Sequence, residues 1–363
     1  MRRQPFAAGL AALGLVIPAL FAAPAPAAAQ QTQRFSLEGQ RVEIYDVAGR
    51  ATLHRGTGNS VVVQATRVGA DAARLEFATD REGTGSSARF RVVYPLDQLD
   101  DGIFWSEQGG TTNLRLRADG TFGGDGDNWF GRRGGTVRVG SRGGFRGSAD
   151  LDITVPEGRE VVLHLAVGRV ELNGTNGTFT IDTWGASVRA QDIAGSYLFD
   201  SGSGDVEVRG ATGSVRIDTG SGSGTVSGIR GDLLDIDTGS GDADATDVQV
   251  ERVRFDTGSG QVRARGLQAR RGVADTGSGD VDLEFTGGEI DDWVIDTGSG
   301  DARLTLPDNA GARISIDTGS GDIDVTRQNV VMERRAHDAM VLRVGDGRGR
   351  IRIDTGSGDV TLR

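Results

Sequence analysis

The sequence predicts an all-β fold: a single-stranded parallel β-helix, or β-solenoid, with coils of about 18–21 residues and an N-terminal β-cap region. Three observations predict this fold. The segment Ile-Asp-Thr-Gly-Ser-Gly-Asp recurs, exactly or with variations, at a nearly constant spacing. Alternating apolar and polar residues flank the copies. Equivalent positions of successive copies carry similar side chains.

The first residue of each motif, Asp-Thr-Gly-Ser or, at residue 200, Asp-Ser-Gly-Ser, defines the spacing. These aspartates are Asp200, Asp218, Asp237, Asp256, Asp275, Asp296, Asp317 and Asp354. The steps between them are 18, 19, 19, 19, 21, 21 and 37 residues, and a degenerate copy begins at Asp182. A fixed period near 20 residues is typical of a solenoid, because so short a unit buries its apolar face only by stacking on its neighbours. The last step, close to two periods, predicts a repeat that has lost its motif near residues 334–338.

Each repeat is predicted to form a strand, a turn, a second strand and a second turn. The residues before and after each motif alternate between apolar and polar, which indicates strands with one buried face. The Gly-Ser-Gly segment suits a tight turn that needs positive φ. We expect the motif Asp to accept backbone N–H groups from the following Gly or Ser, as in an Asx-turn.

Stacked coils should produce columns of equivalent residues. The residue before the motif Asp is apolar in every copy, and six residues after the Asp the chain is again apolar, with Gly224 as the exception. The next position should point outward. From Asp244 to Asp324 its charge alternates in the order Asp244, Arg263, Asp282, Arg303, Asp324. Since neighbouring strands lie about 4.8 Å apart, this alternation favours parallel stacking in one register.

The same geometry argues against an aspartic protease. Such an enzyme needs two aspartates that face each other across one cleft and share a proton. Stacked repeats instead place their aspartates side by side in a file. We therefore expect no catalytic residue in the motif and no enzymatic activity.

The first residues predict export. Arg2 and Arg3 precede an apolar stretch at residues 6–21, and three alanines at 27–29 resemble a cleavage site, so residues 1–29 are predicted to be a signal peptide. Without Arg2 and Arg3 the chain has 38 basic and 51 acidic residues, a net charge of −13. This charge opposes nucleic acid as a partner. We expect no membrane span, no cofactor and a periplasmic, extracellular or cell-surface location.

Residues 30–148 are predicted to form an N-terminal β region that contains an insert at 97–148. Alternating runs at residues 41–47, 60–64, 74–77 and 88–94 indicate strands that open the solenoid or cap its end. The insert is rich in Gly, Arg and aromatic residues. Such side chains can stack on sugars or bind an anionic partner, and the alternative is a loop that lays its aromatics over the solenoid. The candidate binding surface consists of Trp105, Trp129, Phe130, Arg132, Arg133 and Phe145.

Two files of aspartates raise the possibility of calcium, because acidic Gly-Asp repeats occur in calcium-binding β-rolls. One file is the motif Asp and the other lies five residues later. The candidate ligands are Asp237, Asp242, Asp275, Asp280, Asp296, Asp301, Asp317 and Asp322. Turn capping explains the same residues without a metal. The three histidines, His54, His164 and His337, are interpreted as isolated surface or core residues.

Residues 149–363 resemble an exported bacterial β-solenoid family named "putative adhesin", a domain of unknown function. The resemblance rests on Ala-Asp-Leu-Asp-Ile-Thr-Val-Pro at 149–156, on Val-Gly-Arg-Val-Glu-Leu at 167–172 and on the Thr-Gly-Ser-Gly-Asp repeats. It extends more weakly to residues 42–53, which look like an early coil. The resemblance implies a β-solenoid domain over residues 149–363 and supplies no catalytic residues.

These observations lead to one functional hypothesis and two alternatives. The hypothesis is an exported, non-enzymatic, adhesin-like binding or scaffold module at the cell envelope, with an envelope protein or polysaccharide as its partner. The first alternative is a carbohydrate-active enzyme, which requires acids outside the repeat pattern to converge in the insert or near residues 330–340. The second is a calcium-stabilised surface repeat protein.

Overall fold

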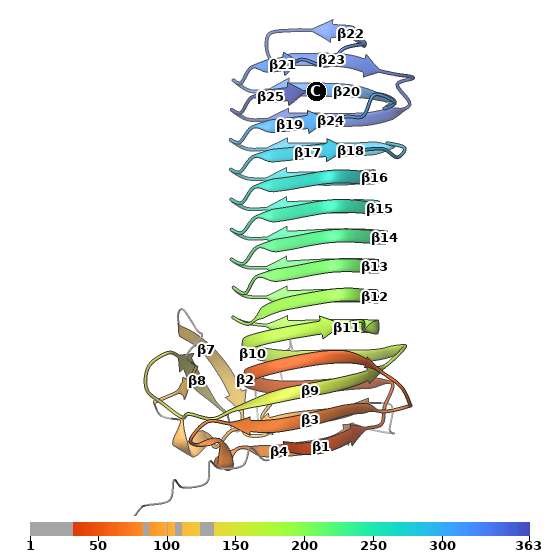
Figure 1. Cartoon of the computed structure of the whole chain (residues 1–363). Helices are drawn as coiled ribbons and strands as arrows, with labels where there is room; N and C mark the ends of the chain where they lie inside the picture. The colour runs from red at the N-terminus through yellow and green to blue at the C-terminus, as the bar shows by residue number, and fades with distance from the viewer. Residues whose placement is uncertain (1–31, 83–86, 100, 106–110, 124–133) are drawn as a thin grey trace, which may run out of the picture. The chain divides into compact units, whose positions relative to one another are not determined.

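The computed structural model describes residues 32–363 except 83–86, 100, 106–110 and 124–133 (Figure 1). The regular structure of these residues is β-strand, apart from two single-turn 3-10 helices, Ala72–Arg74 (η1) and Leu96–Gln98 (η2). Most strands of the repeat region pair in parallel and lie one above another, which confirms the predicted β-solenoid. No helix in the described part of the chain is long and apolar enough to cross a membrane.

Long strands form the middle of the stack, and each runs from the end of one motif to the start of the next. They are β12 (Ser187–Ser201), β13 (Val206–Thr219), β14 (Gly224–Thr238), β15 (Ala243–Thr257) and β16 (Val262–Thr276). Each pairs in parallel with the next one, and the register places Asp200 beside Asp218 and Asp218 beside Asp237. The predicted columns therefore exist.

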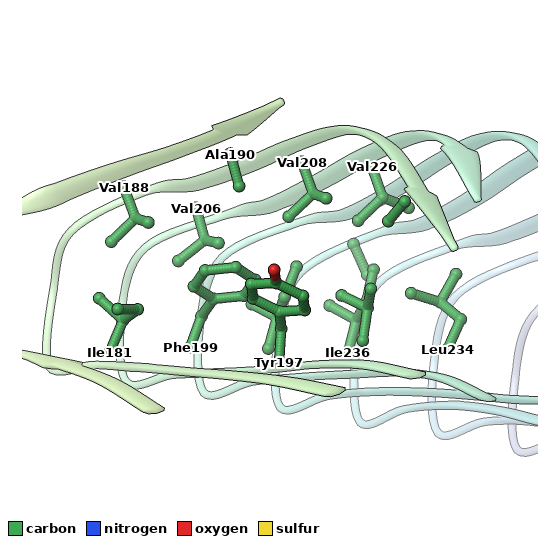
Figure 2. Close-up of a cluster of buried hydrophobic side chains, with 14 of the residues drawn as sticks. Ile181, Val188, Ala190, Tyr197, Phe199, Val206, Val208, Val226, Leu234 and Ile236 are labelled. Atoms are coloured by element: carbon green, nitrogen blue, oxygen red, sulfur yellow. The ribbon is translucent and has the colours of Figure 1, made fainter. Parts of the chain in front are cut away.

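Each coil folds into two opposed layers. The long strands bend at a corner where Gly210 and Gly228 have φ near +70°, a conformation that glycine adopts without strain. Inward side chains such as Val206 and Val208 then face Phe199 and Ile236 across the core (Figure 2). The alternation of the sequence thus becomes one continuous apolar core between two polar outer surfaces.

The motif Thr, and not the motif Asp, caps the tight turn. Thr297 is buried, and its Oγ1 donates to the carbonyl oxygen of Gly300, three residues later, at 2.5 Å. Thr318 and Thr355 make the same bond within their own turns. The expected Asx-turn is wrong because strand alternation points the motif Asp outward and leaves the next side chain inside, beside the turn.

The second glycine of the motif is required by the close approach of successive turns. A Cβ on Gly260 would lie 1.8 Å from the carbonyl oxygen of Gly241, and one on Gly279 would lie 1.9 Å from that of Gly260. Real Cβ atoms do not approach an oxygen this closely, so any side chain would push the coils apart. The absence of a Cβ therefore lets the turns stack at strand spacing.

The C-terminal part of the stack is out of sequence order. Its strands are β17 (Val281–Phe285), β18 (Asp292–Thr297), β19 (Ala302–Thr305), β20 (Ala312–Thr318), β21 (Ile323–Val325), β22 (Val330–Arg335), β23 (Ala339–Val344), β24 (Gly349–Thr355) and β25 (Val360–Leu362). β24 lies between β18 and β20, and β25 lies between β19 and β21. Antiparallel β23 pairs with β20, and β22 pairs with β23 beyond it.

This order corrects two predictions. The 37-residue step holds an antiparallel hairpin, β22–β23, and not a stacked repeat that lost its motif. The alternating charge column is right at Asp244–Arg263, 3.3 Å apart, and at Asp282–Arg303, 3.8 Å apart. It fails at its end because Thr361 of β25 lies between Arg303 and Asp324.

The N-terminal strands form the other end of the stack. Its strands are β1 (Thr32–Leu37), β2 (Arg41–Gly56), β3 (Val61–Val68), β4 (Glu76–Glu82), β5 (Ser87–Val93), β9 (Ser148–Pro156), β10 (Arg159–Asn173) and β11 (Asn176–Thr183). β2 runs parallel to β10 along most of its length, as expected for an early coil, and β10 leads through β11 to β12. The insert adds a separate sheet of β6 (Ile103–Phe104), β7 (Thr111–Arg117) and β8 (Gly134–Gly140).

The close approach of the turns makes a direct prediction. Gly260→Ala should lower the free energy of unfolding by about 2 kcal/mol or more, since the new methyl group overpacks against backbone. Gly135→Ala is the matched control because nothing lies within 4 Å of its Cβ position, and it should change stability by less than about 0.5 kcal/mol. Urea unfolding measures both. Equal effects of the two substitutions would contradict the account of the turn.

Candidate functional site

The motif aspartates form one continuous row on the outer surface of the stack. In spatial order this motif-aspartate row is Asp182, Asp200, Asp218, Asp237, Asp256, Asp275, Asp296, Asp354 and Asp317. Partial burial, followed by the charges of Asp237 and Asp235, raises the pKa of Asp218. Near the middle of the row, Arg254 donates to Asp237 at 2.9 Å and to Asp256 at 2.5 Å. The row is thus an acidic surface, and guanidinium groups reduce the repulsion between its carboxylates locally.

A second aspartate row lies five residues further along each repeat and holds successive coils together. Its members are Asp205, Asp242, Asp280, Asp301, Asp359 and Asp322. Asp242 Oδ1 accepts the backbone N–H of Gln261 at 2.9 Å, and Asp280 Oδ1 accepts that of Asp301 at 3.0 Å. The bonds continue through Asp359 to Asp322. These carboxylates have a structural role, because those of Asp205, Asp242, Asp280, Asp301 and Asp359 each accept an amide N–H of the next coil.

The eight calcium candidates divide equally between the two rows, so the structure brings them into files and not into a cage. One oxygen of Asp242, Asp280 or Asp301 already accepts an amide proton. Within the described ranges, no group of three or more His, Asp or Glu side chains is placed to hold a metal ion. Calcium binding stays a hypothesis.

A histidine–aspartate pair stands where the motif-aspartate row meets the first coils. His164 lies beside Asp182 in the strand register, and His164 Nδ1 is 2.7 Å from Asp182 Oδ2. Tyr45 stacks on His164 from the other side, with ring centroids 4.3 Å apart and an interplanar angle of 9°. The interpretation of His164 as isolated is wrong. The missed signal was the period, since His164 precedes Asp182 by one 18-residue step.

The insert covers this pair with an aromatic side chain. Phe122 is buried and meets Tyr45, His164 and Trp184 edge to face, with ring centroids 5.9–6.4 Å apart. Arg117 holds the segment around Phe122, residues 121–123, by donating to Thr121 Oγ1 and to the Gly123 carbonyl oxygen, both at 3.2 Å. Trp184 occupies the place of the first glycine in the degenerate motif. The repeat is therefore broken where the insert packs on the coils.

His54 is not isolated either. Its Nε2 lies 3.1 Å from Asp152 Oδ2 in an exposed pair. Pairing of β2 with β9 places Asp152 beside Thr52, one outward position from His54 on the same strand. This contact depends on strand pairing between segments about a hundred residues apart, which no local pattern indicates.

The predicted aromatic surface is only partly described. Trp129, Phe130, Arg132 and Arg133 lie outside the described residues. Trp105 is half-buried against the core, and its backbone N–H donates to the Gly140 carbonyl oxygen. Phe145 is 4% exposed and packs edge to face on Tyr94. Its prediction as a surface residue is wrong, because it anchors the insert to the core.

A groove opens on the outer surface where the period changes from 18 to 19 residues. The register shifts between Gly213 and Ser214, and the extra residue, Asp232, lies at the shift. The groove has a volume of about 380 Å³ and is lined by Leu198, Arg216, Leu233, Glu251 and Arg252, among others. Leu198 is 37% exposed there. The groove offers charged, hydrogen-bonding and apolar contacts together, and the change of period was the signal for it.

The second break in the repeat, residues 330–340, forms the β22–β23 hairpin. Glu333 lies in this hairpin, and its carboxylate is bound by Arg313 at 2.8 Å and approached by Arg343 at 3.7 Å. A carboxylate held between two guanidinium groups serves as an ion-paired anchor of the hairpin. The local break therefore contributes to capping the stack.

A buried carboxyl group lies behind Tyr45. Asp46 is fully buried, and its Oδ1 accepts from the Tyr94 hydroxyl at 3.1 Å and from the Ala48 N–H at 3.4 Å. Burial raises the pKa of Asp46 well above its ordinary value, and the Asp46 charge adds to burial in raising the pKa of Tyr94. This site therefore favours the neutral carboxyl group.

Asp46 predicts a pH dependence with a definite sign. Because its pKa is higher in the folded than in the unfolded protein, its contribution to stability is complete below about pH 3.9 and is lost as the pH rises through the folded pKa. Asp46→Asn cannot ionise. The difference in unfolding free energy, variant minus wild type, should therefore increase from pH 4 to pH 7 in urea titrations. A difference that is constant or decreases would contradict the assignment.

The amide-bound second aspartate row predicts the effect of removing metal. The melting temperature should be the same in EDTA and in millimolar CaCl2, because backbone N–H groups already stabilise the carboxylates. Differential scanning calorimetry measures it. A melting temperature that rises with calcium and returns on chelation would instead support the calcium-stabilised alternative.

The chain is similar to a solved structure and to a protein family. A solved structure described as "a putative cell adhesion protein from Clostridium sporogenes" shares 9% identity, with 92% of this chain and 98% of that chain covered and a TM-score of 0.21. No curated protein matches the chain. The family described as Toastrack DUF4097 matches residues 153–363, more than half of the sequence. The chain belongs to the Toastrack DUF4097 family.

Proposed function

We propose that this chain is an exported, non-enzymatic, adhesin-like binding or scaffold module of the bacterial cell envelope. Its partner is an envelope protein or polysaccharide. The observation that carries the proposal is the motif-aspartate row, in which one outward side chain type repeats from coil to coil. Catalysis needs one specific arrangement of different groups, whereas this surface repeats the same group.

A periodic surface suits a partner that is itself a polymer or an array. Strand spacing puts equivalent side chains about 4.8 Å apart, so an extended partner meets the same contact at each coil. Individual exposed contacts are weak, of the order of 0.2–1 kcal/mol. Several contacts made by one linked partner add together, which gives affinity without a deep pocket.

The groove and the insert supply contacts that the rows lack. Leu198 and Leu233 give the groove apolar surface beside Arg216 and Arg252, and arginine with exposed apolar or aromatic groups is typical of binding hot spots. The aromatic and arginine side chains at 129–133 offer the same chemistry within the insert. We expect these two places to select the partner, and the rows to strengthen its binding.

Export belongs to the same proposal. The charged and apolar residues of the predicted signal peptide, followed by three alanines, support secretion. The mature chain would then act in the periplasm or on the cell surface.

Co-sedimentation of the mature protein with envelope fractions tests the proposal. The test variant is Trp129→Ala with Phe130→Ala, Arg132→Ser and Arg133→Ser, because deletion of the whole insert would remove buried residues such as Phe122 and Phe145. We expect wild type to sediment with the envelope and the variant to bind at least about tenfold more weakly, as for loss of hot-spot residues.

The control variant is Arg209→Ser with Arg265→Ser, which removes two exposed arginines outside the insert. It should bind like wild type. If wild type does not sediment with any envelope fraction, the proposal is wrong. Release of sugars from envelope polysaccharide by the pure protein would favour the alternative of a carbohydrate-active enzyme.

A further inference from the structure

Residues 349–363 occupy a place in the stack that the chain order does not give them. This returning coil, made of β24, the Gly-Ser-Gly turn and β25, lies between the coil of β18–β19 and the coil of β20–β21. The chain builds both neighbouring coils first, forms the β22–β23 hairpin and then comes back (Figure 1). The two coils therefore enclose a slot, which residues 349–363 fill.

The returning coil is bonded on both of its edges. The Gly356 N–H donates to the Thr297 carbonyl oxygen at 3.0 Å, and the Gly319 N–H donates to that of Thr355 at 2.9 Å. On the other strand, the Val360 N–H donates to the Asp322 carbonyl oxygen at 2.9 Å. Both walls of the slot thus present backbone groups that need a strand between them, and an unpaired edge of this kind is a template for strand addition.

The side chains of the slot specify what fits. Ile351, Ile353, Val360 and Leu362 of the returning coil are buried, with at most 2% exposed. The turn fits because the glycines of the walls allow close approach: a Cβ on Gly358 would lie 1.9 Å from the Gly300 carbonyl oxygen. The ligand of the slot is therefore an extended peptide with alternating apolar residues around Thr-Gly-Ser-Gly-Asp, and the chain itself contains it.

A short segment connects the returning coil to the rest of the chain. Residues 345–348 turn the chain from β23 into β24, and Gly345 and Gly347 have φ of +55° and +70°. A Cβ on Gly345 would lie 2.4 Å from the Ala310 carbonyl oxygen. A short hinge that joins a complete structural unit to the chain is the arrangement from which domain swapping proceeds, since the same contacts form when the unit belongs to another copy.

We propose that the slot is a peptide-binding site which accepts residues 349–363 of a second copy of this chain, so that copies join by exchanging returning coils. The contacts across the slot are the same within one chain and between two chains. At low protein concentration the covalent connection favours the arrangement within one chain, because it raises the effective concentration of residues 349–363 at their own slot. Exchange is then promoted by high protein concentration or by refolding of mixed copies. The proposal does not depend on the envelope function.

Cysteine cross-linking tests the exchange in the full-length mature chain, which contains no cysteine. Arg352 and Ser315 are register partners on β24 and β20, and both are exposed. Adjacent partners are close enough for a disulfide after substitution. Arg352→Cys and Ser315→Cys chains are refolded together from urea at high concentration and then oxidised. The control replaces Ser315→Cys with Thr225→Cys, which is exposed on a distant coil.

A heterodimer of the Arg352→Cys and Ser315→Cys chains should form at least about tenfold more than the control heterodimer, because only exchange brings the first two positions together. If the Arg352→Cys and Ser315→Cys chains give no more heterodimer than the control pair, the proposal is overturned.

A second measurement addresses the slot itself. The full mature chain is refolded from urea in the presence of a labelled peptide of residues 346–363, and fluorescence anisotropy follows binding. A peptide with Ile351→Asp and Ile353→Asp is the control and should bind at least about tenfold more weakly, since it would bury unpaired charge. Equal binding of the two peptides by the refolded chain would also overturn the proposal.

Discussion

The close stacking of one Gly-Ser-Gly turn on the next is the constraint on which the rest of this structure depends. The second motif glycine lies against the carbonyl oxygen of the glycine one coil away, with no room for a Cβ at Gly241, Gly260 or Gly279. This contact fixes both the spacing and the register of the coils. The buried motif Thr then closes the turn from inside, and the second aspartate row ties each turn to the next from outside.

Fixed register has consequences for the surface. Because every coil presents its motif Asp at the same place, the carboxylates form a row of like charges. Ion pairs with neighbouring groups such as the Arg254 guanidinium reduce the repulsion between them. Where the repeat is broken, the surface carries other side chains and another shape. At the N-terminal end His164 takes the place of an aspartate and lies under Phe122 of the insert, and at Asp232 an added residue opens a groove. The regular repeats thus form the scaffold, and the irregular repeats give it surface sites that differ from the rest.

Much of the fold could be predicted from sequence because every repeat contains the same period, the same inward positions and the same turn residues. The expectation of positive φ in the Gly-Ser-Gly turns was wrong, since none of these motif glycines has one. The capping atom was misassigned because Asp and Thr both cap turns. The apolar residue before each motif Asp gave the strand phase, which points the Asp outward and the Thr inward. The returning coil was hidden, because a lost repeat and a hairpin excursion give the same 37-residue step. Phe145 was misassigned because its burial depends on packing against Tyr94, fifty residues away. The groove was signalled by a change in the period, and His164 was signalled by its position one period before Asp182.

Native-state hydrogen exchange of the returning coil tests the stacking account most directly. The amides of Gly356, Asp359 and Val360 are bonded to the coils that flank residues 349–363. Their counterparts in the middle of the stack are Gly239, Gln261 and Val262. The account predicts that the two sets exchange at similarly slow rates, as expected for strands paired on both edges. Rapid exchange at Gly356, Asp359 and Val360, as in a fraying terminus, would show that these residues do not lie inside the stack and would contradict it.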